Sequence, residues 1–158
     1  MSALIYVETS IPSFYHETRI ELEHQARRKW TREWWKIARL RDELVTSLAV
    51  IAELEEAPEP KRRKGIALLE PLPLLQGSPT VDELVAVYLK HKLMPTDATG
   101  DARHLALATF HGCGVLATWN CRHIANPNKR GHIERVNAML GFETPLLVTP
   151  VELLETES

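Results

Sequence analysis

Cysteine is scarce in this chain, and long apolar runs are missing from it. Cys113 and Cys121 are its only cysteines. Their spacing matches neither a zinc site nor a redox pair, so we expect reduced thiols in a cytoplasmic protein. No apolar stretch approaches the roughly 18–20 residues that cross a bilayer. The sequence opens on a strand-like segment with neither a basic region nor a cleavage site, so we expect no export signal and no membrane association.

A glycine-rich phosphate loop is also missing, which disfavours nucleotide binding of that type. The net charge of −2 does not by itself indicate a nucleic-acid-binding protein. The basic residues are nevertheless clustered, at 27–32, 61–64 and 129–130. Such clusters can form local positive patches on a near-neutral protein, although a solvated helix face is the simpler explanation for any one of them.

The stretch 95–127 has the pattern of a helix, a glycine break and a short buried strand that ends in polar residues. We expect Asp97 to cap the helix and Gly112 to end it in a left-handed conformation. The apolar run at 114–118 is typical of a buried strand in a parallel sheet. This strand brings Asn120 to its carboxyl end, the edge at which open α/β sheets bind ligands.

Strand-like and helix-like segments alternate along the rest of the chain. Further strands are expected at 3–8, 44–46, 72–75 and 146–148, and further helices at 18–41, 47–56, 61–70, 80–93 and 127–141. This alternation predicts a parallel sheet covered on both faces. With 158 residues the chain is long enough to bury a core. We therefore expect one domain, residues 1–158, with a three-layer α/β/α sandwich fold.

Several local signals place the helix ends and faces. Thr18–Glu21 and Thr80–Glu83 fit capping boxes, and Asn126 is a candidate N-cap followed by proline. In the helix at 18–41 the apolar residues predict a stripe, formed by Leu22, Ala26, Trp30, Trp34, Ile37 and Leu40. Trp35 lies off this stripe, where a partner or another element of the chain would cover it.

Four polar side chains are expected at the carboxyl edge of the sheet. Glu8 ends the first strand, Glu53 lies in the helix after the second, Asp101 opens the helix at 98–111, and Asn120 follows the strand at 114–118. Clustered carboxylates repel one another unless a cation compensates their charge. Oxygen ligands favour Mg²⁺ or Mn²⁺. Taken singly, Glu53 could be a solvated helix residue and Asp101 a complement to the helix dipole.

Four sequence blocks, in this order, resemble the PIN-domain family of metal-dependent ribonucleases, and in particular the VapC-type toxins. They are Ile-Tyr-Val-Glu-Thr-Ser at 5–10, Thr46-Ser47 through Glu53, Asp-Ala-Arg-His-Leu-Ala-Leu-Ala at 101–108, and Ala-Thr-Trp-Asn at 117–120 with Arg-His-Ile at 122–124. Each block is short, so the resemblance lies in their order and spacing. It implies an endoribonuclease that hydrolyses RNA with water activated by Mg²⁺ or Mn²⁺.

The resemblance also assigns roles to individual residues. Glu8, Glu53 and Asp101 would be metal-binding acids, Thr9 or Ser10 would support the first of them, and Asn120 would occupy the fourth polar position of the catalytic set. The family often has aspartate where this chain has Glu8 and Asn120, and a neutral fourth position weakens metal binding. A small antitoxin partner and a homodimer are implied as well, with the tryptophans at 30–35 as a candidate interface.

Other readings are weaker or remain open. A zinc site from His104, His111 and His123 lacks a recognised spacing, and Cys121 lacks the glycine-flanked turn of a nucleophile. A surface position explains His123 as well as a role near the acids. A haloacid-dehalogenase-type phosphohydrolase needs an aspartate where Glu8 stands. The main alternative is a non-catalytic PIN-like module that only binds RNA or protein.

Overall fold

The structure, a computed structural model, describes residues 2–155. At its centre is a sheet of five strands in the order β3-β2-β1-β4-β5. The strands are β1 (Leu4–Val7), β2 (Glu43–Ser47), β3 (Leu74–Leu75), β4 (Val115–Ala117) and β5 (Leu146–Val148). Every neighbouring pair is parallel, so the carboxyl ends of the strands lie along one edge.

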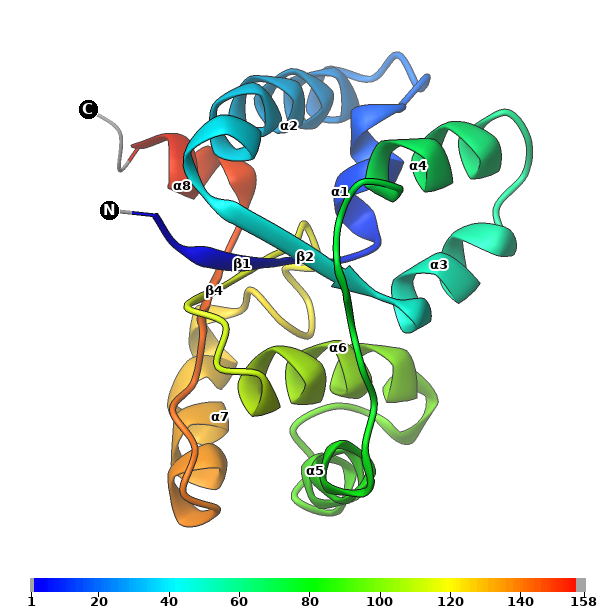
Figure 1. Cartoon of the computed structure of the whole chain (residues 1–158). Helices are drawn as coiled ribbons and strands as arrows, with labels where there is room; N and C mark the ends of the chain where they lie inside the picture. Colours follow the sequence, from blue (N-terminus) through cyan, green and yellow to red (C-terminus); the bar gives the residue numbers. More distant parts are fainter. Residues whose placement is uncertain (1, 156–158) are drawn as a thin grey trace.

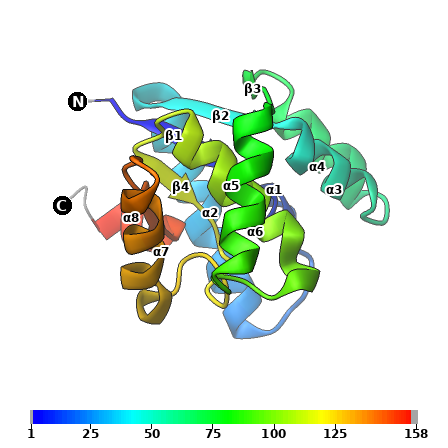
Figure 2. The same ribbon diagram turned by 90° about the horizontal axis from the view of Figure 1, so that it is seen from below.

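Helices cover both faces of this sheet (Figure 1). On one face lie α1 (Ser10–Tyr15), α2 (Leu22–Arg41) and α8 (Pro150–Glu155). On the other lie α5 (Pro79–Lys90), α6 (Thr99–Phe110) and α7 (Pro127–Met139), which Figure 2 shows in front of the strands. The helices α3 (Leu48–Glu55) and α4 (Lys61–Leu69) pack against each other beyond the end of β2, and a short 3₁₀ helix, η1 (Thr96–Ala98), precedes α6. The predicted three-layer α/β/α sandwich is confirmed.

Strand β1 is central and positions the start of the site. Its residues 5–7 are at most 1% exposed, as expected for a strand covered on both faces. In the register of β1 with β4, Val7 pairs with Ala117. The residues that follow the two strands, Glu8 and Thr118, are therefore neighbours at the carboxyl edge.

Two predicted helix-end signals, at Asn126 and Gly112, are present, and a cap at the start of α8 adds a third. Asn126 caps α7, because its side-chain oxygen accepts a hydrogen bond from the N–H of Asn128. At the start of α8, Thr149 and Glu152 exchange side-chain and backbone hydrogen bonds. Gly112, with φ of 69°, ends α6 in the left-handed conformation that glycine adopts without strain.

Two other predicted starts are wrong. Helix α5 begins before the Thr80–Glu83 box, because Oγ of Ser78 accepts from the N–H of Val81 and Pro79 occupies the first helical turn. Asp97 does not cap α6, since it lies within η1 and makes no capping hydrogen bond. In both places a competing signal a few residues away determines where the helix begins.

The start of α2 also differs from the prediction. The Thr18–Glu21 segment forms no capping box, and α2 begins at Leu22 without a side-chain cap. The preceding chain is held instead by Glu17, whose buried carboxylate accepts hydrogen bonds from Arg19 and from Lys61 of α4. This ion-pair cluster fixes the connection between α1 and α2.

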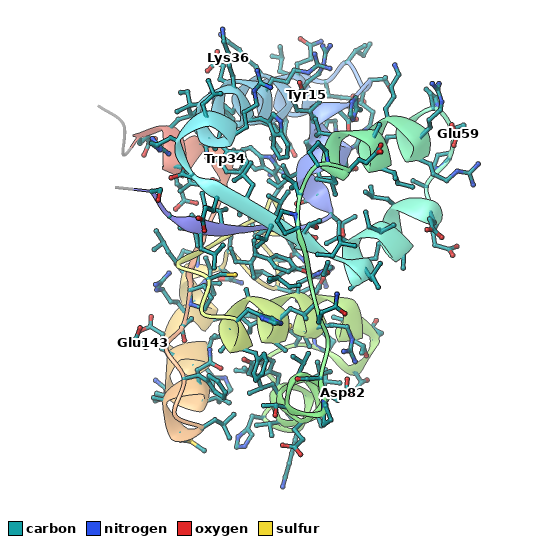
Figure 3. All side chains as sticks on the ribbon, in the orientation of Figure 1. Tyr15, Trp34, Lys36, Glu59, Asp82 and Glu143 are labelled. Atoms are coloured by element: carbon teal, nitrogen blue, oxygen red, sulfur yellow. The ribbon has the colours of Figure 1, made fainter. Side chains whose placement is uncertain are left out.

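The buried face of α2 is rotated from the predicted stripe. Trp34 and Trp35 are 1% and 7% exposed, whereas Leu22 and Leu40 at the helix ends are 84% and 79% exposed. Trp34 lies on the side of α2 that faces the sheet, and Lys36 points away from it (Figure 3). Trp35 is thus covered by its own chain, because the buried face is centred between the two large indole side chains.

Within the described residues, none of the helices has the length and apolarity needed to span a membrane.

Candidate functional site

The carboxyl edge of the sheet gathers side chains from distant parts of the sequence. Glu8 follows β1, Glu53 comes from α3 and His104 comes from α6. An oxygen of each glutamate and a ring nitrogen of His104 lie within 4.8 Å of one another. Among the described residues this is the only such group of possible metal-binding side chains.

Glu8 is buried, with 5% of its surface exposed, and its Oε1 is surrounded by donors. The Ser10 N–H lies 3.0 Å from this oxygen, the Ser10 hydroxyl also donates to it, and Oγ1 of Thr118 donates over 2.6 Å. No donor among the described residues reaches the other oxygen, Oε2. The side chain of Glu8 is therefore held through Oε1, and Oε2 is left without a donor from the described residues.

Glu53 repeats this arrangement from α3. Its Oε1 accepts hydrogen bonds from the Thr9 hydroxyl and, over 2.6 Å, from Nε2 of His104. Its Oε2 has no donor among the described residues and lies beside Gly100, where an added Cβ would approach within 2.8 Å. The side chain is 41% exposed. Glu53 is thus accessible to solvent while one of its oxygens is held.

His104 is fully buried, and both of its ring nitrogens have partners. Besides the contact of Nε2 with Glu53, Nδ1 lies 2.7 Å from the Tyr6 hydroxyl, which in turn lies 2.8 Å from Oγ of Ser47. Burial raises the pKa of Tyr6 well above its usual range, so the phenol keeps its proton. A zinc ion could use His104 only by displacing one of these partners.

Glu53 and His104 shift each other's pKa. Burial opposes the charge on Glu53, but hydrogen bonds from His104 and Thr9 outweigh it and lower the carboxyl pKa below its ordinary value. Burial likewise opposes a charge on His104, but the hydrogen bond to Glu53 and the charges of Glu8, Glu53 and Asp101 raise the imidazole pKa. The charge of Asp101, in the first turn of α6, therefore acts on the same site.

Asn120 lies at the edge of this group rather than in it. Its N–H donates over 2.9 Å to Oγ1 of Thr118, the residue that also holds Glu8. Its side-chain oxygen accepts from the N–H of His123 over 3.0 Å and so stabilises the turn after β4. Asn120 is linked to Glu8 through one intervening side chain, and no described hydrogen bond joins it to Glu53 or Asp101.

The donor set fits a hard divalent cation. The oxygens without donors on Glu8 and Glu53, together with the carboxylate of Asp101, are the ligand type that Mg²⁺ and Mn²⁺ prefer. Because each glutamate is anchored through its other oxygen, binding a cation would break no hydrogen bond of the chain. The structure thus brings Glu8 and Glu53 together with His104, whereas Asp101 is not among the side chains whose ligand atoms lie within 4.8 Å of one another and acts on His104 through its charge.

The alternative sites predicted to be unlikely find no support in the geometry. His104, His111 and His123 do not converge: Nε2 of His111 lies 2.7 Å from the carbonyl oxygen of Gln76, and Nδ1 of His123 lies 3.3 Å from a lysine ammonium on α7. Burial raises the pKa of the Cys121 thiol, which makes it a weaker nucleophile at neutral pH.

Sequence reasoning missed the residues behind Glu53. His104 follows Asp101 by one helical turn, so the two share a face of α6. Tyr6 precedes Glu8 by two residues, and residues at this spacing point to the same side of a strand. Both spacings were visible, whereas the contact of Ser47 with Tyr6 depends on how β1 and β2 pair.

In comparisons with known proteins, no family model, no curated protein and no solved structure matches the chain. The resemblance to PIN domains thus remains an expectation from the sequence. What the site does has to be inferred from the side chains that it brings together.

Proposed function

We propose that this protein is a divalent-metal-dependent endoribonuclease that hydrolyses RNA phosphodiester bonds, acting in the cytoplasm as the toxin of a toxin–antitoxin pair. One observation carries the chemistry: Glu8 and Glu53 are each anchored through Oε1, and neither Oε2 has a donor among residues 2–155. RNA is proposed as the substrate because the order of the sequence blocks resembles PIN-domain ribonucleases.

In this proposal Glu8, Glu53 and Asp101 hold one Mg²⁺ or Mn²⁺ ion. Such an ion supplies an activated water and neutralises charge on the phosphate. The chain's own contribution is to orient the two glutamates. Ser10 and Thr118 hold the carboxylate of Glu8, and His104 holds that of Glu53. Because Glu53 is the more exposed of the two glutamates, it is the one nearer to an approaching RNA strand.

Basic and aromatic side chains next to Glu8 support an RNA substrate. The N–H of Trp119 donates over 2.7 Å to Oγ of Ser10, which itself donates to Glu8. The Arg27 guanidinium lies 5.1 Å from the centre of the Trp119 ring, and Trp30 stacks on the same indole. Over the first half of α2, a groove of about 870 Å³ is lined by Arg28, Lys29 and Arg32 together with acidic and apolar side chains. Such residues would provide salt-dependent contacts to phosphates.

The proposal includes an antitoxin partner and a homodimer. The α2 tryptophans do not provide the interface in the way predicted, because Trp34 and Trp35 are buried within the chain. The large apolar side chains that α2 leaves exposed are Leu22, Ile37 and Leu40. These three residues are the part of α2 that such contacts would cover.

The proposed activity is tested by incubating a mixed RNA with the protein in Mn²⁺, Mg²⁺ or EDTA. We expect cleavage with either metal, none in EDTA, and none by Asp101→Asn. Asp82→Asn is the matched control, because Asp82 is 68% exposed on α5 and pairs with Arg103. Cleavage by the Asp101 variant at the wild-type rate, or in the presence of EDTA, would contradict the proposal.

A second candidate function is a non-catalytic module that binds RNA or protein. It is favoured by Asn120, which adds no charge to the site and whose side-chain oxygen is already used by the N–H of His123. Calorimetric titration with Mn²⁺ distinguishes the two candidates. Absence of both metal uptake and cleavage would favour the binding module, whereas metal uptake with cleavage would favour the nuclease.

A further inference from the structure

The hydrogen bonds behind Glu53 form a continuous chain that ends on a backbone amide. The N–H of Val50 donates to Oγ of Ser47 over 3.4 Å, and this Oγ lies 2.8 Å from the Tyr6 hydroxyl. That hydroxyl is 2.7 Å from Nδ1 of His104, whose Nε2 is 2.6 Å from Oε1 of Glu53. Side chains from β1, β2 and α6 thus meet behind one carboxylate of α3.

Only one direction of donation gives each hydroxyl and ring proton of this chain an acceptor. Oγ of Ser47 already accepts from Val50, so Ser47 donates its own proton to Tyr6. Tyr6 then donates to Nδ1 of His104, and the neutral ring carries its proton on Nε2, where Glu53 accepts it. In the reverse direction the Ser47 proton has no acceptor among the described residues, which is unfavourable in a buried position.

We propose that Tyr6 and Ser47 are positioning residues: by fixing His104 as the Nε2–H tautomer, they hold Oε1 of Glu53 toward the protein and leave Oε2 for a divalent cation. Proteins commonly orient a ligating group through a hydrogen bond from a residue behind it. Here that residue is a histidine whose own tautomer is set by a third group. The inference rests on the proposed function only in taking Glu53 as a metal ligand.

Burial makes this control effective. Tyr6 and His104 are 0% exposed and Ser47 is 1% exposed. If one of these hydrogen bonds is removed, bulk water has no direct access to replace it, and hydrogen bonds are stronger in such surroundings than in water. A change at Tyr6 is therefore transmitted to Glu53 although Tyr6 itself does not contact the carboxylate.

The test uses Tyr6→Phe, which keeps the ring and removes the hydroxyl. Nitrogen NMR of the ¹⁵N-labelled, metal-free protein reports which ring nitrogen of His104 carries the proton, with His104→Gln used for assignment. At a pH high enough to keep His104 neutral, we expect a single Nε2–H tautomer in the wild type and a mixture in Tyr6→Phe. Calorimetry should show Mn²⁺ binding about tenfold weaker in the variant. Tyr88→Phe is the matched control, because this buried hydroxyl donates over 2.6 Å to Asn137, away from the site.

A second pair of variants does not depend on how well Tyr6→Phe folds. His104→Gln keeps an N–H that can reach Glu53, whereas His104→Leu has none. We expect the glutamine variant to bind Mn²⁺ more tightly than the leucine variant. An unchanged His104 tautomer in Tyr6→Phe, an equal loss of affinity in Tyr88→Phe, or equal losses in both His104 variants would overturn the inference.

The outcomes separate this inference from the proposed function. Wild-type protein that binds Mn²⁺ but cleaves no RNA would overturn the nuclease, while a tautomer change and weaker binding in Tyr6→Phe would still support the positioning role. Cleavage that Tyr6→Phe leaves unchanged, together with an unchanged tautomer, would overturn the positioning role and leave the nuclease standing. A wild type that takes up no Mn²⁺ would overturn both.

Discussion

Thr118 donates a hydrogen bond of 2.6 Å to Oε1 of Glu8, across the pairing of β4 with β1. The other donors to this oxygen are the N–H and the hydroxyl of Ser10, which lies only two residues after Glu8 in the sequence. Thr118 therefore ties the Glu8 carboxylate to the second half of the chain, in addition to the backbone hydrogen bond from Glu8 to Ala117. It also determines which oxygen of Glu8 is left for a cation.

Thr118→Val tests this contact. The substitution keeps the shape of the side chain but removes the donor to Glu8 and the acceptor for the N–H of Asn120. We expect the free energy of unfolding to fall by about 1–3 kcal/mol and Mn²⁺ binding to weaken, measured by urea denaturation and calorimetry. Thr46→Val is the control, because Thr46 is equally buried and donates to the carbonyl oxygen of Val7 over 3.0 Å. Weakened Mn²⁺ binding in both variants would contradict a specific role for Thr118.

Gly100→Ala should separate metal binding from stability. An added Cβ would lie 2.8 Å from Oε2 of Glu53, so the flexible carboxylate has to move away. We expect little loss of stability, because alanine favours helices over glycine by up to about 1 kcal/mol, but a clear loss of Mn²⁺ binding and cleavage. Gly131→Ala in α7 is the matched control, since its nearest contact would be an ordinary 3.6 Å from Arg135. If Gly100→Ala binds Mn²⁺ as well as Gly131→Ala does, Oε2 of Glu53 is not a ligand.

Glu17 should contribute to stability in a pH-dependent way. Hydrogen bonds from Arg19 and Lys61 lower its pKa from 4.5 to about 2, although its burial acts in the opposite direction. A lowered carboxyl pKa means that the contribution is complete above pH 4.5 and is lost as the pH falls toward 2. We expect a contribution of about 1–2 kcal/mol, less than the full shift implies, because Arg19 is half exposed and screened by solvent.

The measurement for Glu17 is urea denaturation of wild type and Glu17→Gln between pH 2 and pH 7. The variant should be less stable at neutral pH and should lose less stability on acidification. Glu59→Gln serves as the control, because Glu59 pairs with Arg62 at the surface, where ion pairs contribute little. Parallel acid profiles for wild type and Glu17→Gln would show that the ion pair has no such effect.

Arg27 is expected to contact RNA phosphates. Its guanidinium lies 5.1 Å from the centre of the Trp119 ring and 5.4 Å from that of the Phe14 ring, and its ion pair with Glu23 is long, at 3.9 Å. Arg27→Gln should weaken RNA binding for all sequences alike and reduce the slope of log K against log salt by about 0.7 for a single strand. Arg130→Gln is the control, because Arg130 pairs with Glu134 over 2.8 Å on α7. An unchanged salt slope in the Arg27 variant would place the RNA elsewhere.

The sequence predicted an element well where one local signal dominated. The apolar runs of β1 and β4 were correctly predicted as strands, and Asn126 followed by proline marked the start of α7. The start of α5 was predicted too late because two valid start signals overlap there. The Ser78-Pro79 signal determines the start in the structure, with the completely buried Val81 in the first turn.

For the candidate site, the sequence predicted which residues follow the strands, but it did not predict which side chains contact one another. Glu8 was found because it follows a buried strand. The contact between Glu53 and His104 joins residues 51 positions apart in sequence, and it depends on how α3 and α6 pack. Thr9 and Ser10 show the same limit: either could have supported Glu8, and only the fold assigns Ser10 to Glu8 and Thr9 to Glu53.

The placement of β4 beside β1 has a consequence for the order in which the protein is made. Glu8 and Glu53 emerge early in synthesis, but Thr118 and the strand that carries it emerge much later. Domains fold as units once their chain is available. A nascent chain that ends before β4 therefore contains Glu8 and Glu53 but lacks Thr118, which holds the Glu8 carboxylate. If the protein cleaves RNA, it is inactive while most of it is being translated, and the messenger RNA and ribosome that produce it are spared until the domain is nearly complete.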